Sequence, residues 1–179
     1  AQAVALGFPA SGPGCLDAPE SPPKTLPFPT NRGTSRHSTP QRRYGMKKPV
    51  VLVGSGGHAR IVLEILRTMP AIEVVGVTTV DPAVREFCGL SVLGDDDALP
   101  RLLAAGVHDV AIGIGGFRDN ELRRRLYLRL RSLGFSAVTA THPSASVSPT
   151  ASVGAGSVLF PGAVLNTDVS VGSNVVIAT

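Results

Sequence analysis

Aliphatic side chains at every sixth position constrain the fold of residues 147–177 more than any other feature of the chain. These positions are Val147, Val153, Leu159, Leu165, Val171 and Ile177. Small or β-branched residues follow each of the first five after four positions, at Ala151, Ser157, Ala163, Val169 and Val175. A period of six is typical of hexapeptide repeats, in which short strands stack as the flat faces of a β-helix. We therefore predict an incomplete parallel β-helix over residues 142–179.

Residues 46–141 show a different pattern, in which apolar strands alternate with periodic helices. The predicted strands cover residues 50–53, 73–78, 91–93, 109–114 and 135–140, and the predicted helices run from 59 to 69, from just after Asp95-Asp96-Asp97, and from about 119 to 133. This alternation is typical of a parallel sheet with helices on its faces. The fold class that we predict is a Rossmann-like α/β domain followed by the start of the β-helix.

The third predicted helix has the clearest apolar stripe. Its members are Leu122, Leu126, Leu130 and Leu133, and Gly134 ends the helix. Five arginines share this helix, at Arg123, Arg124, Arg125, Arg129 and Arg131. Because the opposite face is apolar, we interpret the arginines as a solvated surface.

Residues 1–45 hold eight of the 15 prolines and no run with a period of 2 or 3.6. Such a segment buries too little apolar surface to offset the entropy of ordering, so we expect a disordered leader. Met46 lies four residues before the first predicted strand and is a candidate for the true start of translation. An Arg- and Ser-rich targeting segment is the alternative.

Charge and composition exclude several classes of protein. The net charge of +4 falls to +1 after residue 45, where 12 basic residues face 11 acidic ones, so nucleic-acid binding loses its electrostatic basis. No apolar run reaches the roughly 18–20 residues of a membrane span, and we expect a cytoplasmic protein. Cys15 and Cys88 are interpreted as free thiols. His37, His108 and His142 suggest no metal site.

The string Gly54-Ser55-Gly56-Gly57-His58-Ala59 lies between the first strand and the first helix. Glycines there let the backbone approach a ligand, and a helix N-terminus favours an anion. The string also fits G-x-G-x-x-A, with Asp81 at a suitable distance for a ribose contact, so an NAD(P)-dependent oxidoreductase is one alternative. A tight turn without a ligand is another. His58 either contacts a phosphate or sugar hydroxyl or caps the turn.

Four motifs in this order resemble one family of proteins. They are the glycine loop at 54–59, Gly113-Ile114-Gly115-Gly116, His142-Pro143-Ser144-Ala145 and the hexapeptides. The family comprises bacterial sugar O- and N-acetyltransferases of the sialic acid O-acetyltransferase and UDP-4-amino-sugar N-acetyltransferase type. The resemblance covers residues 47–179.

The resemblance implies a small N-terminal domain that binds a nucleotide-sugar or sugar acceptor. It also implies a left-handed β-helix that forms a homotrimer and binds acetyl-CoA as cosubstrate. The acceptor contacts implied for this sequence are Gly54, Ser55, Gly56, Gly57, His58, Asp81 and Gly115. Where the family has adjacent aspartates after the second strand, this chain has Asp81 alone.

In the resembling family, the general-base histidine follows the strand that corresponds here to the end of the chain, at Ile177-Ala178-Thr179. We therefore predict no catalytic residue within this chain. We expect the N-terminal part of an acetyltransferase, inactive by itself, that works in surface polysaccharide or glycan biosynthesis. A non-catalytic sugar-nucleotide-binding module remains a further alternative to the oxidoreductase.

Overall fold

The computed structural model describes residues 47–116 and 120–179. Both ranges belong to one unit of the chain, Arg42–Thr179. The predicted leader, with Cys15 and His37, lies outside the described residues, and so does Met46. Cys88 is a free, exposed thiol. None of the helices in the described ranges has the length and apolarity needed to cross a bilayer.

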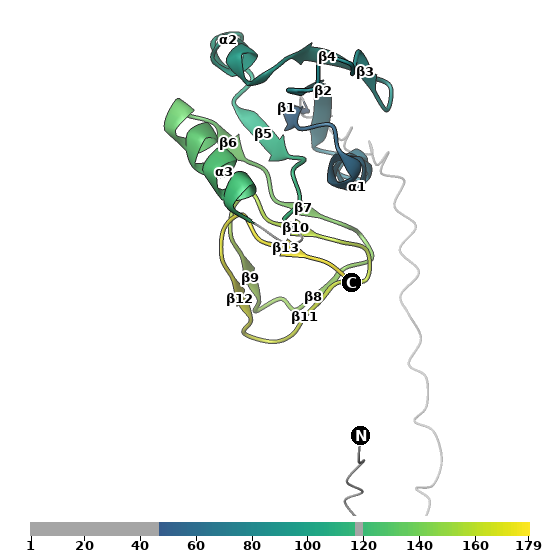
Figure 1. The fold of residues 1–179 in the computed structure, drawn as a ribbon. Helices are drawn as coiled ribbons and strands as arrows, with labels where there is room; N and C mark the ends of the chain where they lie inside the picture. Colours follow the sequence, from purple (N-terminus) through teal and green to yellow (C-terminus); the bar gives the residue numbers. More distant parts are fainter. Residues whose placement is uncertain (1–46, 117–119) are drawn as a thin grey trace, which may run out of the picture. The chain divides into compact units, whose positions relative to one another are not determined.

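The N-terminal part is a six-stranded sheet in the order β3-β4-β2-β1-β5-β6 (Figure 1). Its strands are β1 (Lys48–Val53), β2 (Ile72–Thr78), β3 (Glu86–Phe87), β4 (Leu90–Gly94), β5 (Asp109–Ile112) and β6 (Ser136–Ala137). All neighbouring pairs are parallel except β3 and β4. The sequence predicts a parallel sheet, so the antiparallel edge is a correction.

A two-residue turn explains the additional strand β3. Cys88 and Gly89 connect β3 to β4, and both have positive φ, at 50° and 82°. A type I′ turn requires positive φ at both of its central residues. This turn is favoured in two-residue hairpins because its twist matches that of the flanking strands. The usual sequence signal for this turn is Asn-Gly or Asp-Gly, and Cys-Gly does not carry it.

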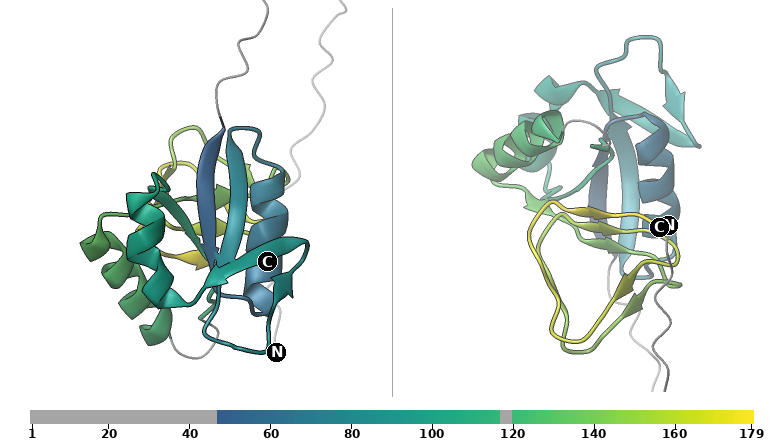
Figure 2. Two further views of the ribbon diagram at one scale, coloured as in Figure 1. Left: turned by 90° about the horizontal axis from the view of Figure 1, so that it is seen from above. Right: turned by 60° about the horizontal axis from the view of Figure 1, so that its bottom comes forward.

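Alternate residues of β1 separate the two sides of the sheet. Val50 and Leu52 pack with helix α1 (Gly57–Arg67), whereas Val51 and Val53 pack with the residues of two other helices. These are α2 (Leu99–Ala104), which follows the short 3-10 helix η1 (Asp96–Ala98), and α3 (Glu121–Leu133). Figure 2 shows α1 on one side of the sheet and α2 and α3 on the other. The predicted α/β pattern is confirmed.

Helix α3 ends as predicted at Gly134, which has a φ of 101°. Leu126 and Leu130 are buried, but the side chain of Leu122 is 53% exposed. The prediction that Leu122 belongs to the buried stripe is therefore wrong. Its neighbour Arg123 is buried instead.

Residues 135–140 form two strands instead of the single predicted one. Strand β6 pairs with β5, whereas β7 (Ala140–Thr141) pairs with β10 (Val158–Leu159) outside the first sheet. The backbone changes partner at Thr139, because Val138 N–H donates to Val110 and Ala140 N–H donates to Ser157. The coil of short strands therefore begins at Ala140.

The C-terminal strands stack in three sets of parallel pairs. They are β7, β8 (Ser146–Val147), β9 (Ser152–Val153), β10, β11 (Val164–Leu165), β12 (Ser170–Val171) and β13 (Val176–Ile177). Each strand pairs with the strand 18 residues further along, so that β7, β10 and β13 make one wall and β8 with β11 and β9 with β12 make the other two. Three repeats of six residues thus complete one turn, and the pairs fit the start of a β-helix.

The coil contributes to two apolar cores. Leu159, Ala163 and Leu165 are buried in its own interior. Val158, in contrast, points into the core that α1 forms with the large sheet, next to Ala140 and Phe160. One wall of the coil therefore packs against the α/β part and lies close to the glycine loop at the start of α1.

Candidate functional site

A cavity of about 620 Å³ lies at the carboxyl ends of β1, β2 and β5. Parallel sheets bind ligands at this end of their strands, where neighbouring connections leave in opposite directions. Here β1 lies between β2 and β5 and provides that position. The cavity lining includes all seven predicted acceptor contacts, Gly54, Ser55, Gly56, Gly57, His58, Asp81 and Gly115.

The positions of the loop differ in whether the fold itself requires glycine. Gly54 has a φ of 104°, and a methyl group there would lie 3.1 Å from Ile114 Cγ1. The tight turn alone therefore explains Gly54. Gly56 and Gly57 have no positive φ, and a Cβ on either would meet no atom within 4 Å. Neither turn geometry nor packing requires these two glycines, and both face the open cavity.

The glycines after β5 allow a close approach between two elements. A methyl group at Gly113 would lie 2.8 Å from the Cβ of Ala59, and one at Gly115 would lie 3.2 Å from Nδ1 of His58. Glycine at these positions lets the end of β5 pack directly against the start of α1. The strand predicted over residues 109–114 ends at Ile112 instead, directly before these glycines.

Hydroxyl groups form the side of the cavity next to β2. Ser55 Oγ lies 2.7 Å from Thr79 Oγ1, and the backbone N–H of Asp81 donates to the same Thr79 oxygen. The hydroxyl of Thr78 is fully buried and has no hydrogen-bond partner among the described residues. Asp81 accepts a hydrogen bond from Ala83 N–H through Oδ1. Its other carboxylate oxygen has no protein donor in the described residues.

Helix α3 brings positive charge to the opposite wall. Arg125 and Arg129 both line the cavity. Arg129 pairs with Asp96 at 3.3 Å and with Asp97 at 3.6 Å, whereas Arg125 has no ion-pair partner in the described residues. Both side chains are exposed, in agreement with the interpretation as a solvated surface, and they also line the cavity. The wall can attract an anionic group without being strongly basic overall.

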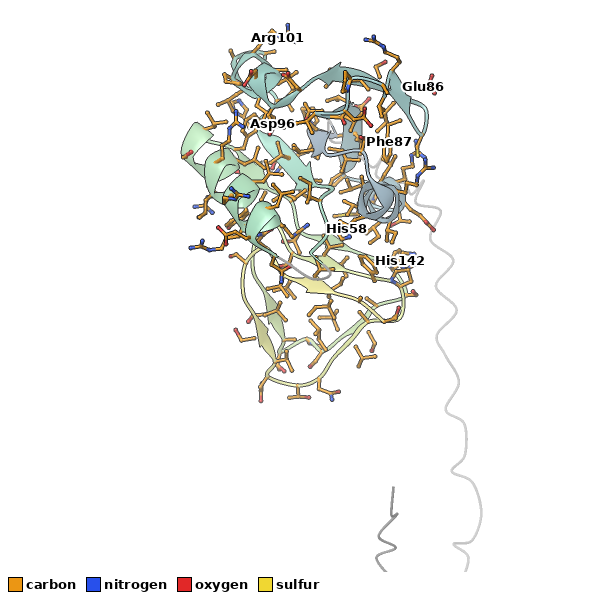
Figure 3. All side chains as sticks on the ribbon, in the orientation of Figure 1. His58, Glu86, Phe87, Asp96, Arg101 and His142 are labelled. Atoms are coloured by element: carbon orange, nitrogen blue, oxygen red, sulfur yellow. The ribbon has the colours of Figure 1, made fainter. Side chains whose placement is uncertain are left out.

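His58 lies at the first turn of α1, where the α/β part meets the coil (Figure 3). Its ring faces that of Phe160 with centroids 5.6 Å apart. Burial, and secondarily the positive charge of Arg123, lower the pKa of His58 from 6.5 to about 4. The imidazole is therefore neutral at pH 7, with one N–H donor and one bare nitrogen.

Arg123 is a site residue that the sequence analysis missed. Its side chain is 1% exposed, which contradicts its assignment to a solvated face. It donates to the carbonyl oxygens of Ile112, Ile114 and Gly156 at 3.1, 2.6 and 2.9 Å. Its Nε donates to the Asn174 carbonyl at 3.3 Å. These carbonyls replace water around the buried cation, and burial lowers its pKa only to about 10.

The remaining histidines do not approach this site. His142 Nδ1 interacts with Ser144 Oγ at 2.7 Å at the start of the coil, and His108 precedes β5. Within the described parts of the chain, no three metal-ligating side chains gather at one point.

Residues 49–130 match the family model of the PglD N-terminal domain. A variant of perosamine N-acetyltransferase from Caulobacter crescentus, solved with CoA and GDP-perosamine, is 40% identical with a TM-score of 0.68. That alignment covers 73% of this chain and 60% of the Caulobacter protein.

The acetyltransferase domain of PglB from Neisseria gonorrhoeae is also similar. It is 26% identical, with a TM-score of 0.67, over 74% of this chain and 63% of that domain. The same domain has been solved with acetyl coenzyme A. This chain thus spans about three fifths of the length of these relatives. By its PglD N-terminal domain and by these structural neighbours, the chain matches the PglD/NeuD-type family of sugar acetyltransferases.

Proposed function

We propose that this chain binds the acceptor of an acetyltransferase, a nucleotide-linked sugar whose hydroxyl or amine takes an acetyl group from acetyl-CoA. The observation that carries the proposal is the open space in front of Gly56 and Gly57. Both line a cavity of about 620 Å³ together with every other predicted contact. A ligand that approaches the backbone explains these two glycines, and the fold alone does not.

The cavity provides three kinds of group for such a ligand. The N-terminus of α1 and the Arg125 guanidinium favour the phosphates. Ser55 and the Asp81 carboxylate oxygen that has no protein donor in the described residues suit hydroxyl or amide groups of a sugar or base. Neutral His58 adds one N–H donor. This mixture fits a nucleotide sugar better than a simple sugar, which carries no anionic group.

The second substrate would be acetyl-CoA. The relatives solved with CoA and GDP-perosamine, and with acetyl coenzyme A, support this assignment. In the reaction the acceptor oxygen or nitrogen attacks the thioester carbonyl, its proton leaves to a base, and the CoA thiolate departs. Residues of the described cavity would hold and orient the acceptor. We do not assign the base to any of them.

The finer features of the family are part of the same proposal. When the parallel strands are numbered by their order in the chain, they lie in the order 3-2-1-4-5 across the sheet. This order supports a Rossmann-like domain. The 18-residue register supports hexapeptide coils of the β-helix type. We further propose that the full protein is a cytoplasmic homotrimer that acts in glycan or surface polysaccharide biosynthesis.

Calorimetric titration with nucleotide sugars tests the proposal directly. The protein should bind a GDP- or UDP-linked amino sugar, and Gly57→Val should reduce that affinity at least tenfold, because the side chain enters the cavity. The far-ultraviolet circular dichroism spectrum should persist, since a Cβ at Gly57 meets no neighbouring atom.

Gly172→Val is the matched control. Gly172 also has no positive φ and no atom within 4 Å of a built Cβ, but it lies in the coil and does not line the cavity. This variant should bind like the parent protein. Tight binding of NAD(P)H with no response to any nucleotide sugar would instead favour the oxidoreductase that the G-x-G-x-x-A pattern suggests.

A further inference from the structure

Arg123 is the charged side chain that links the acceptor cavity to the coil. It begins on α3 and reaches the carbonyls of Ile112 and Ile114 at the end of β5. On its other side it reaches Gly156 and Asn174, which belong to the coil. The coil returns the contact, because Asn174 Nδ2 donates to the Arg123 carbonyl at 3.4 Å. Three separate segments therefore meet at one guanidinium.

This cation also lies directly behind the cavity histidine. Arg123 Nη1 is 3.5 Å from Nε2 of His58. His58 lines the cavity of about 620 Å³, whereas Arg123 lines a second cavity of about 450 Å³ between α3 and the coil. The contact therefore joins a residue that lines one cavity to a residue that lines the other.

The chemistry of the pair determines where the histidine proton resides. Arginine has only N–H donors and no acceptor. A proton on Nε2 would place one N–H against another and against a full positive charge, whereas a bare Nε2 presents its lone pair. The proton of the neutral ring therefore belongs on Nδ1. That nitrogen lies on the Gly115 side, and no described residue accepts a hydrogen bond from it.

We propose that Arg123 is a positioning residue of the acceptor site, which fixes the His58 ring as a neutral donor with its proton on Nδ1, available to the bound acceptor. The proposal rests on the proposed function for the identity of the acceptor, but not for the state of the ring. Gly115 completes the arrangement, since a Cβ there would lie 3.1 Å from Cγ of His58 and 3.2 Å from its Cβ and Nδ1.

Other charged groups line the same cavity as His58. Asp81 from the loop after β2, Asp96 from η1, and Arg125 and Arg129 from α3 line the same cavity. The coil contributes the uncharged ring of Phe160. Among the described charged groups, Arg123 is the one that contacts His58, so its removal should change the ring more than the removal of any cavity arginine.

Nitrogen-15 NMR of the imidazoles tests the proposal in the unaltered protein. At pH 7 the His58 signals should show a protonated Nδ1 and an unprotonated Nε2. In Arg123→Met this preference should disappear, and affinity for the nucleotide sugar should fall at least tenfold. Arg131→Met is the matched control, because Arg131 is an exposed arginine on the same helix and lines neither of these two cavities. It should leave both the tautomer and the affinity unchanged.

Several outcomes overturn the proposal. One is a proton on Nε2, or an imidazolium, in the unaltered protein at pH 7. Another is a folded Arg123→Met variant that keeps the Nδ1 proton. If Arg123→Met does not fold, the nitrogen-15 spectrum of the unaltered protein decides. The same spectrum of Arg123→Lys is recorded beside it, because lysine keeps the charge but not the planar fork of donors. If the proton is on Nδ1 but the protein binds no nucleotide sugar, the proposed function is overturned. The role of Arg123 in positioning the His58 ring then still stands.

Discussion

His58 couples the stability of the folded chain to pH. Its pKa is about 4 in the folded state, mainly because of burial and secondarily because of Arg123, and 6.5 is the ordinary value. A folded pKa below the unfolded value means that the unfolded chain takes up the proton first as the pH falls. The stabilising effect is therefore complete above pH 6.5 and is lost as the pH falls toward 4.

We expect the free energy of unfolding to fall by on the order of 1 kcal/mol between pH 7 and pH 5 because of this single group. This value is half of what the full pKa shift implies, because the ring is partly exposed to solvent. Urea unfolding at the two pH values measures the loss. The same experiment on His58→Gln isolates the contribution, because glutamine does not titrate. Equal losses in the two proteins would contradict the lowered pKa.

Periodicity could not distinguish Arg123 from Leu122. At about 100° per residue the two positions flank the stripe of Leu126, Leu130 and Leu133 by nearly equal angles, roughly 50° on either side. Hydrophobicity then favours the leucine. The deciding factor is a set of carbonyls from β5 and the coil, which only the folded chain brings together. The cavity residues, in contrast, lie at loop positions after strands, where sequence motifs are informative.

At the scale of elements, the chain following β4 shows how one side chain starts a helix. Asp95 accepts a hydrogen bond from the backbone N–H of Asp97 at 3.0 Å and caps η1, which continues into α2. This cap also fixes the backbone of Asp96, whose carboxylate pairs with Arg129 at 3.3 Å in the lining of the cavity.

Asp95→Ala should lower the free energy of unfolding by about 1 kcal/mol, the usual effect of removing an N-cap. Thermal unfolding followed by circular dichroism measures the change. Asp97→Ala provides the comparison, because the Asp97 side chain is 91% exposed and its ion pair with Arg129 has a distance of 3.6 Å. It should change stability by less than about 0.5 kcal/mol. Equal effects would show that the capping hydrogen bond contributes little.

Strand positions were easier to predict than strand partners. The apolar run at 135–140 contains strand residues at both ends, but its two halves join different sheets. Side-chain alternation is the same on both sides of this change, so no local pattern marks it. The six-residue repeat is different, because its register of 18 residues follows from three repeats per turn.

At the scale of the whole described unit, the coil and the α/β part share an apolar core. Val158 of β10 packs into the cluster that contains α1 and β1, and Phe160 packs against the same cluster. Arg123 adds hydrogen bonds between the two parts. Two segments that share buried surface and polar contacts should unfold together. We therefore expect one cooperative transition for the coil and the sheet.

The repeat itself supplies a matched pair of substitutions for testing this shared core. Val158 and Val164 each begin a coil strand and lie one repeat apart, but Val158 is 2% exposed and Val164 is 62% exposed. Val158→Ala should lower the free energy of unfolding by about 2 kcal/mol, because it leaves a cavity between the coil and α1. Val164→Ala should change it by less than about 0.5 kcal/mol. Urea unfolding, followed by both circular dichroism and tyrosine fluorescence, measures the two values at equal protein concentration. Two separate transitions in the parent protein, with only one of them shifted by Val158→Ala, would mean that the coil folds without the sheet and that the shared core does not couple them.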